Sequence, residues 1–479
     1  MNRLLSFLIL LMLPAAALAF RDNGNLHVER RSYSGAKAGI YRLLLTDKQG
    51  TAYSLKHPAR FLSRKSIERR RRQGLQVDST DLPVSRQYLR QICRKGVTLV
   101  GTSKWNNSVL IQCGDSTLLT TISRLPFVKD CCQVWQAPDS VEQYRRHTRL
   151  QNRFMAWDSV PSSRYAAAER QMEVLAGKEL HDMGYVGQGM TIAVLDGGFE
   201  NADCIPAFAK TRLAGSHDFV YPPSRNIFSE TDHGTKVYSV MASNAPHVFV
   251  GTAPGATYWL LRCEDQQSEQ PVEEDYWAMA AEFADSVGAD LINSSLGYTE
   301  FDRHLGDHQY HQMDGHSTFI SHTASMLARK GIILVNSAGN NGMGPWKKLS
   351  FPADAEDILT VGAVTSTLDN APFSSVGPTQ DGRVKPDLMA IGSPTHLLSG
   401  RGTLIEDMGT SFATPIICGL MACLWQALPS FTAVELMDLI RQTGSNCQHP
   451  DNIFGYGLPD FKKAYRIGRE RESGTKGTR

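Results

Sequence analysis

The chain contains 479 residues, of which 42% are hydrophobic and 20% are charged, and its formal net charge is +2. This composition is that of a globular protein, and the length is sufficient for two or three domains with one large core. A charge balance this close to neutral gives no reason to expect a nucleic acid or an acidic surface as a partner.

The first residues are typical of an export signal. Arg3 is followed by an apolar run from Leu4 to Leu13 and by Ala17-Leu18-Ala19, so residues 1–19 are predicted to be a secretory signal peptide. The run is too short for a membrane span, and no later stretch reaches about 18 apolar residues. We therefore expect an exported protein, extracellular or periplasmic, without a membrane span.

Residues 20–135 are predicted to form a first domain of short elements. Strands are expected over "IYRLLLTD", "VTLVG", "SVLIQC" and "FVKDCCQVW", and helices over 60–72, 84–95 and "STLLTTISRL". Apart from the extra helix, the order is β-α-β-β-α-β, which is typical of a ferredoxin-like α+β domain.

A strongly basic stretch lies inside this domain. Residues 56–72 carry eight basic side chains and one acidic one. Nucleic-acid contact and dibasic processing are two functional interpretations, and a solvated helix face with Phe61, Leu62 and Ile67 turned inward is the structural one. We favour the structural interpretation, because the rest of the chain carries no nucleic-acid signal.

The second half of the chain has a different pattern. Residues 136–165 are predicted to be a linker, and from 166 to 465 apolar strands alternate with helices, notably 272–287 and 316–330. The strands are expected over "MTIAVLD", "ATYWLLRC", "ADLINSS" and "GIILVNSAGN". This alternation predicts a buried, mostly parallel α/β sheet, with ligands at the carboxyl ends of its strands. Residues 466–479 are predicted to be a flexible tail.

Several polar residues stand where such strands and helices begin or end. Asp196 ends a strand, His233 starts a helical stretch, Asn340 follows a strand, and Ser411 lies in "GTSFATP". Each has a structural explanation by itself: turn formation for Asp196 and Asn340, and helix capping near His233 and Ser411, with Pro415 in a first turn.

Taken together, the same residues supply a nucleophile, a base and an orienting acid. A serine hydroxyl needs a base to take its proton, and the base needs a partner that orients it. Asp232 adjoins His233, but a side chain at the preceding position rarely points at the same imidazole, so Asp196 is the better candidate. An exposed backbone edge at Ser295, Leu296 and Gly297 could accept an extended peptide by strand addition.

These motifs resemble the subtilisin-like serine peptidases, the subtilase family. "VLDGGF", "DHGTKV", "SSLG", "SAGNNG", "FSSVGP" and "GTSFATP" occur in the order of that family, with the triad order Asp, His, Ser. The resemblance implies a three-layer α/β/α sandwich with a mostly parallel sheet. It further implies Asp196 as orienting acid, His233 as general base, Ser411 as nucleophile, Asn340 as oxyanion donor and Ser295–Gly297 as the substrate-binding strand.

The N-terminal domain is similar to the inhibitory propeptide of the same family, and stretches such as "RFLSRKSIERRRRQG" look closest to secreted subtilases of Bacteroidetes-type bacteria. The resemblance implies a secreted serine endopeptidase made as a zymogen, with protein or peptide substrates, its own prodomain as inhibitor and a maturation site within 136–165. The alternatives are a catalytically inactive subtilase-like binding protein and a serine esterase or amidase.

No cofactor is expected to be required. His304, His308, His311 and His316 are interpreted as loop histidines, with a metal site as the alternative, and no metal ligand is assigned. Many subtilases bind structural calcium, but no calcium loop can be assigned residue by residue. The nine cysteines show no zinc spacing and no disulfide framework.

Overall fold

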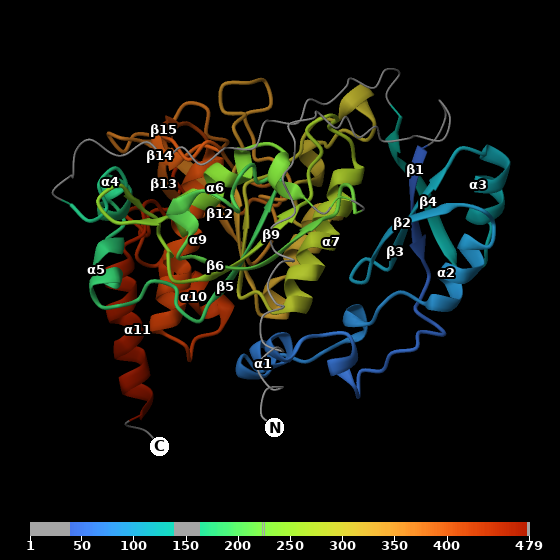
Figure 1. Cartoon of the computed structure of the whole chain (residues 1–479), viewed down its shortest axis with the longest axis horizontal. Helices are drawn as coiled ribbons and strands as arrows, with labels where there is room; N and C mark the ends of the chain where they lie inside the picture. Colours follow the sequence, from blue (N-terminus) through green and yellow to red (C-terminus); the bar gives the residue numbers. More distant parts are fainter. Residues whose placement is uncertain (1–38, 138–162, 223, 225, 477–479) are drawn as a thin grey trace, which may run out of the picture.

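The structure is a computed structural model and describes residues 39–137, 163–222, 224 and 226–476 (Figure 1). The predicted signal peptide and nearly all of the predicted linker lie outside the described residues. Within them, the chain forms a large parallel sheet enclosed by helices, and a small antiparallel sheet packed against one side of it.

The large sheet has seven strands in the order β13-β12-β11-β10-β5-β9-β6, and every pairing between them is parallel. The strands are β5 (Thr191–Asp196), β6 (Arg212–Asp218), β9 (Thr257–Arg262), β10 (Leu291–Ser294), β11 (Ile333–Ser337), β12 (Leu359–Thr365) and β13 (Leu388–Ser393). The central strand β5 is buried along its whole length, as its continuous apolar sequence predicts.

Helices cover both faces of this sheet, which confirms the predicted three-layer α/β/α fold. One face holds α6 (His233–Ala242), α9 (Thr410–Ala427), α10 (Ala433–Arg441) and α11 (Phe461–Lys476), with the short helices α4 (Glu169–Glu173) and α5 (Gly177–Asp182) beside them. The other face holds α7 (Val272–Val287) and α8 (Phe319–Ser325). Alternate residues of β5 pack into the two cores: Ile192 and Val194 on the α9 side, Ala193 and Leu195 on the α7 side.

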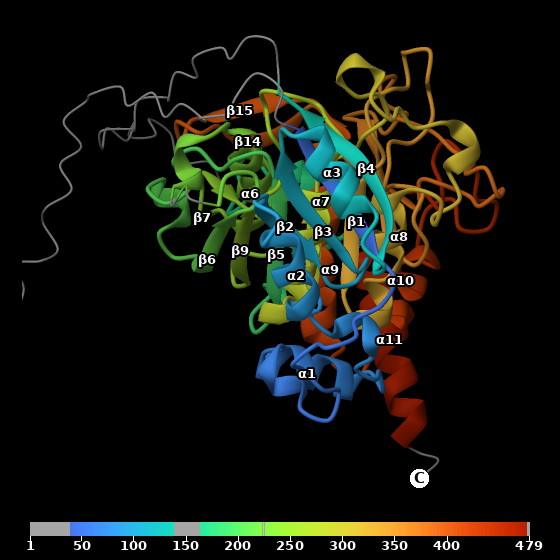
Figure 2. The same ribbon diagram turned by 90° about the vertical axis from the view of Figure 1, so that its right-hand side faces the viewer.

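The small sheet has the order β2-β3-β1-β4 with antiparallel pairings, as in a ferredoxin-like domain. Its elements are β1 (Gly39–Leu45), α1 (Arg64–Arg72), α2 (Arg86–Cys93), β2 (Thr98–Ser103), β3 (Ser108–Cys113), α3 (Ser116–Ser123) and β4 (Val128–Gln136). One face packs on α2 and α3, and the other lies against α7 (Figure 2). Trp135 and Leu110 of the small sheet therefore share a core with Tyr276 of α7.

The structure corrects the interpretation of the basic stretch. Part of the expectation holds, because Arg64, Arg71 and Arg72 are exposed and Leu62 is buried. Arg69 and Arg70, however, are each only 1% exposed, whereas Ile67 is only partly buried. Their guanidinium groups are buried because they meet a carboxylate of the large domain, Asp285, at the end of α7. Arginine is almost never fully buried without such a partner.

The C-terminal region also differs from the prediction. Residues 461–476 form the helix α11, so the predicted flexible tail from 466 is wrong as far as Lys476. Phe461 and Ala464 are wholly buried in the core on the α9 side, and their packing stabilises a helix whose remaining face is charged and solvated.

The remaining short strands form two hairpin-like pairs on the large domain. They are β7 (Asn244–Ala245) with β8 (Phe249–Val250), and β14 (Thr395–Leu398) with β15 (Leu404–Asp407). Among the described helices, α9 alone is long and apolar enough to cross a membrane, and 94% of it is buried inside the domain. The helix is not an unbroken apolar run, because it contains Thr410, Ser411, Thr414 and Gln426, and its burial is that of a core helix.

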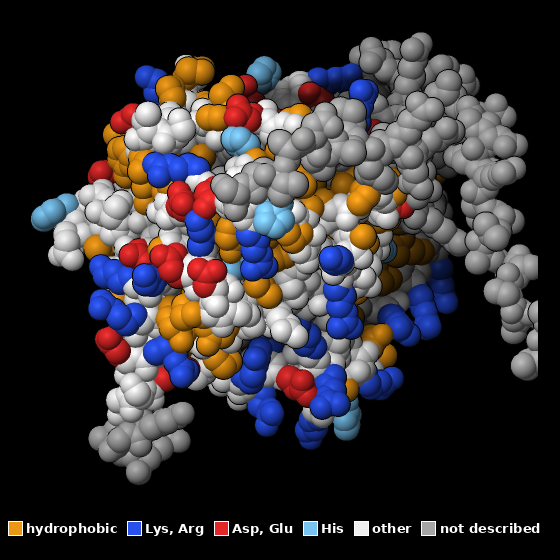
Figure 3. All heavy atoms as spheres, turned by 60° about the vertical axis from the view of Figure 1, so that its left-hand side comes forward, with side chains coloured by type: hydrophobic (Ala, Val, Ile, Leu, Met, Phe, Trp, Pro, Cys, Tyr) orange, Lys and Arg blue, Asp and Glu red, His pale blue; other side chains and the backbone are white. Residues whose placement is uncertain are grey.

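The described surface carries no single-signed face in the view of Figure 3, where acidic and basic side chains are interspersed and apolar side chains form small groups. This distribution agrees with the near-neutral net charge.

Candidate active site

His233 and Asp196 meet at the carboxyl edge of the large sheet. Asp196 is the last residue of β5 and is wholly buried, and His233 is the first residue of α6. The Nδ1 atom of His233 lies 2.9 Å from Oδ1 and 3.0 Å from Oδ2 of Asp196. Because a carboxylate only accepts hydrogen bonds, Nδ1 carries the proton, and Nε2 of the neutral ring is left to accept one.

The surroundings of this pair favour the protonated imidazole. Burial lowers the pKa of His233, but the charge and the hydrogen bond of Asp196 outweigh it and raise that pKa to about 9. Asp232 does not contribute to this pair: its carboxylate accepts from the backbone N–H of Gly400 at 3.2 Å and pairs with Lys236 at 3.4 Å. Of the two acids considered from the sequence, the structure brings Asp196 to the histidine.

Ser411 is the second residue of α9, and it is 8% exposed. Its hydroxyl donates to the carbonyl oxygen of Ser295 at 3.2 Å, and the Ser295 hydroxyl donates back to the carbonyl of Ser411 at 2.8 Å. The imidazole of His233 lies beside this turn, with its centroid 5.6 Å from that of the Phe412 ring. The Ser411 hydroxyl must leave Ser295 to donate to His233, a loose arrangement that is common in enzymes without substrate.

Pro415 has a different position from the one predicted. It lies in the second turn of α9, not the first, where its missing N–H leaves the carbonyl four residues earlier without a helical donor. That carbonyl belongs to Ser411, and the Ser295 hydroxyl takes the vacant place at 2.8 Å. Pro415 thereby lets β10 and α9 be joined at the serine.

Asn340 is held by the residue that precedes Ser411. Its Oδ1 accepts from both the backbone N–H and the hydroxyl of Thr410, each at 3.0 Å. Because the backbone N–H of Thr410 is a donor, it must face the amide oxygen of Asn340 and not its NH₂ group. The Nδ2 group of Asn340 therefore points away from Thr410 and remains available as a donor. Asn340 is exposed, and Gly339 before it turns the chain with a φ of +104°, a conformation that favours glycine.

Ser295, Leu296 and Gly297 follow β10 at the same edge. Ser295 and Leu296 are 5% and 4% exposed, and Gly297 is exposed. The Leu296 carbonyl accepts weakly from Asn336 and Ser337, each at 3.4 Å. The predicted edge is thus present beside Ser411, anchored through Ser295.

Two residues at this edge were not found from the sequence. Arg262 ends β9, and its Nε donates to the carbonyl of Gly197 at 2.9 Å, which steadies the turn after Asp196. Glu264 lies two residues after Arg262, and its negative charge adds to the rise in the pKa of His233. The pKa of Glu264 is itself raised to about 8, first by burial and then by repulsion from Asp196. The available signal was their position, because β9 is the neighbour of β5 in the sheet.

Three of the four predicted loop histidines, His304, His308 and His316, have separate partners. His304 pairs with Asp307 at 2.6 Å, buried His308 pairs with Glu274 at 2.8 Å, and His316 pairs with Glu356 at 3.1 Å. Among the residues that the structure describes, no three His, Cys, Asp or Glu side chains are grouped so as to hold a metal ion. All nine cysteines are free thiols.

A parallel seven-stranded sheet with this Asp, His and Ser arrangement at its carboxyl edge defines a subtilisin-like domain. The model of the subtilase family, peptidase family S8, matches residues 187–457, more than half of the chain, and the chain belongs to this family. A second model, the Bacteroidota propeptide domain of peptidase family S8, matches residues 40–152, which include the small sheet.

Individual relatives support the same assignment. The chain is 28% identical to subtilisin NAT of Bacillus subtilis subsp. natto over 282 residues, which are 58% of this chain and 65% of that protein. It is 27% identical to a thermostable alkaline protease of Halalkalibacterium halodurans over 59% of this chain and 69% of that one. The crystal structure of MycP1 without its N-terminal propeptide shares the fold, with a TM-score of 0.50 and 23% identity over 62% of this chain and 96% of that one. The match with subtilisin NAT spans just under two thirds of that relative's length.

Proposed function

We propose that the chain is an exported serine endopeptidase made as a zymogen. The observation that carries the proposal is the pairing of buried Asp196 with His233 beside the first turn of α9, where Ser411 stands. Export rests on the signal-like sequence of residues 1–19 and on the similarity to the Bacteroidota propeptide type.

In the proposed reaction, Ser411 Oγ attacks the carbonyl carbon of a peptide bond while His233 Nε2 takes its proton. Asp196 holds the imidazole and stabilises its charged form. The oxyanion that develops accepts hydrogen bonds from Asn340 Nδ2 and from the N–H of Ser411 at the start of α9. His233 then protonates the leaving amine, and a water molecule activated by the same base releases the acyl group. Protein groups carry every step, so no metal or cofactor is proposed for the chemistry.

The substrate is proposed to be a protein or peptide. The exposed backbone at Gly297 can pair with an extended chain, a mode of binding that small esters cannot use. Casein or a peptide library tested beside short-chain esters separates a peptidase from an esterase or amidase.

The N-terminal domain is proposed to be the inhibitor of this enzyme. Its last strand, β4, ends at Gln136, whose N–H donates to the side chain of Gln270 at 2.7 Å and whose carbonyl accepts from it at 3.1 Å. Gln270 lies between the carboxyl end of β9 and the start of α7, so β4 ends near the carboxyl edge of the large sheet, where Asp196 and His233 lie. We expect maturation by a cut within residues 136–165.

The test uses a fluorophosphonate probe and four full-length chains. The parent chain should be labelled at Ser411 after maturation and should cleave casein. Ser411→Ala and His233→Ala should lose both activity and self-cleavage, while Asp232→Asn, the matched control beside the base, should keep most of both. Labelling without any peptide cleavage would favour an esterase, and absence of labelling in the folded, matured chain would favour an inactive binding protein.

A further inference from the structure

Helix α1 lies at the edge of the large sheet opposite to the active site (Figure 1). Lys65 Nζ pairs with Asp290, just before β10, at 2.8 Å and donates to the hydroxyl of Thr191, the first residue of β5. Gln73 donates to the carbonyl of Gly331, just before β11, at 2.8 Å. These are the amino ends of three central strands, whereas Asp196 is the last residue of β5 and Asn340 follows the carboxyl end of β11.

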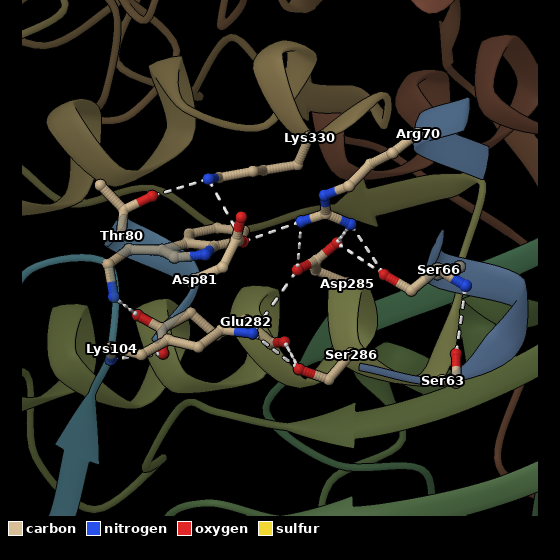
Figure 4. Close-up of polar contacts among 12 residues, drawn as sticks. Ser63, Ser66, Arg70, Thr80, Asp81, Lys104, Glu282, Asp285, Ser286 and Lys330 are labelled. Carbon is tan, nitrogen blue, oxygen red and sulfur yellow. Dashed lines mark hydrogen bonds and ion pairs between the residues drawn. The ribbon is translucent and has the colours of Figure 1, made fainter. Parts of the chain in front are cut away.

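Two arginines of α1 converge on one carboxylate at the last turn of α7, and Figure 4 shows one of them, Arg70, beside Asp285. Arg70 forms a fork with Asp285, at 2.7 Å to Oδ1 and 2.9 Å to Oδ2, and Arg69 contacts the same carboxylate. Arg69 also donates to the carbonyls of Lys330 and Ala289. Cations at this position also face the negative end of the α7 dipole. Planar, bidentate pairing of this kind is the strongest form of charged hydrogen bond.

A lysine of the large domain meets the N-terminal domain in the opposite sense. Lys330 is 1% exposed, and its Nζ contacts the Thr80 hydroxyl at 2.6 Å and a carboxylate oxygen of Asp81 at 3.2 Å (Figure 4). It also pairs with Asp78 at 3.2 Å. Asp81 also pairs with Arg70 at 2.9 Å, so the cations and carboxylates of both domains form one network.

Within the described residues, the recorded partners of the Asp285 carboxylate and of Lys330 Nζ all come from the N-terminal domain. Burial raises the pKa of Asp285, but the positive charges of Lys104, Arg69 and Arg70 outweigh it and hold that pKa below its usual range. In the assembled chain, the hydrogen bonds and ion pairs of these two buried groups are therefore supplied across the contact between the two domains. Removing one partner of such a pair leaves a buried charge unpaired, which is far more costly than losing a surface pair.

We propose that residues 63–81 form an anchor at the amino-terminal edge of the large sheet, which keeps the N-terminal domain bound after the chain between the domains is cut. An element at this edge cannot obstruct a cleft at the opposite edge, so its buried charges serve attachment and the recognition of a matching N-terminal domain. The inference rests on the proposed function only in so far as the chain is cut between its domains.

The anchor can be tested without peptidase activity. A full-length Ser411→Ala chain with a site for a sequence-specific protease inserted between residues 138 and 162 is captured by a C-terminal tag, cut, and washed. The measurement is the rate at which the N-terminal domain leaves. We expect slow release from this parent chain. Arg70→Ala and Asp285→Ala should each accelerate release by about 30-fold or more, the effect of truncating one partner of a desolvated, hydrogen-bonded charge pair.

The matched control is Arg71→Ala, an arginine on the same helix whose side chain is exposed. It should release at the parent rate within about threefold, as expected for a surface charge. Because Asp285→Ala removes a charge from the large domain, the uncut variants are first compared by thermal melting, and Arg70→Ala decides if Asp285→Ala does not fold. Release of the parent domain within the wash, or equal rates for Arg70→Ala and Arg71→Ala, would overturn the anchor. Absence of peptidase activity in the matured chain that retains Ser411, together with slow release from the Ser411→Ala chain, would count against the proposed function alone.

Discussion

Replacing Asp196 by asparagine removes the charge that opposes the burial of His233 and leaves the size of the side chain unchanged. The pKa of His233 is raised to about 9 in the structure, against an ordinary value of about 6.5. A difference of this size corresponds to a preference for the imidazolium of about 3 kcal/mol. Because burial acts in the opposite direction, the charge and hydrogen bond of Asp196 supply more than this net amount.

In Asp196→Asn, burial still lowers the pKa of His233, but the charge of Asp196 no longer raises it. We therefore expect this pKa to fall below its ordinary value. The assay is an NMR titration of the imidazole C–H signals in full-length Ser411→Ala chains, which cannot digest themselves. Asp232→Asn is the matched control, because Asp232 is adjacent in sequence but contacts Gly400 and Lys236 instead. Its titration should stay close to that of the parent.

The same reasoning fixes the sign of the pH dependence of activity. Only the neutral imidazole accepts the proton of Ser411, so kcat/KM of the matured enzyme should rise as the pH passes upward through the pKa of His233. Asp196→Asn should move this rise to lower pH and reduce kcat by about 10⁴-fold, as for the orienting acid of other serine triads. An unchanged His233 titration in Asp196→Asn, or an equal shift in Asp232→Asn, would refute the assignment of Asp196.

Three further outcomes are expected. In the same titration, Glu264→Gln should lower the pKa of His233 by less than Asp196→Asn does. The reason is that the charge of Glu264 raises this pKa less than the charge of Asp196 does. An unchanged pKa would mean that Glu264 is neutral when His233 titrates. Asn340→Ala should reduce kcat by about 10²–10³-fold with little change in KM, a magnitude whose reference case is subtilisin itself, whereas Asn341→Ala, which only loses a contact to Ser350, should stay near the parent. Phenanthroline should not inactivate the matured enzyme, and inactivation that zinc reverses would restore the metal interpretation of His304, His308, His311 and His316.

The catalytic half of the fold was predictable because its signals are local. Strands β5, β9, β10 and β11 are apolar runs buried on both faces, and α7 covers the predicted range of 272–287. The strand β6 was missed, because its residues are mostly exposed and show no clear alternation. Strands β12 and β13 were also not predicted, although they are largely buried. Helix α11 was missed because residues 468–475 are all polar, charged or glycine. Its buried side is marked by Phe461 and Ala464, which pack in the core on the α9 side.

The site was predictable for a related reason. Parallel strands have their carboxyl ends at one edge of the sheet. Residues at the carboxyl ends of β5 and β11 therefore lie at the same edge, whatever the conformation of the loops. The carboxamide orientation of Asn340 and the role of Pro415 were not predictable, because both depend on contacts across the site, to Thr410 and from Ser295. The burial of Arg69 depends likewise on Asp285, a carboxylate 216 residues away in the sequence.

The two edges of the large sheet therefore carry different kinds of interaction. At the carboxyl edge, the side chain of His233 is partly accessible and Ser411 is 8% exposed, and both are held by few contacts, as a site that must admit a substrate requires. At the amino edge, Arg69, Arg70 and Lys330 are almost completely buried, and each forms an ion pair with a carboxylate of the opposite domain. A domain that only obstructed the cleft would need no contacts at the amino edge. In the proposed zymogen, the buried network at that edge supplies attachment separately from obstruction of the cleft, so we expect cutting of the chain and release of the N-terminal domain to be two distinct steps.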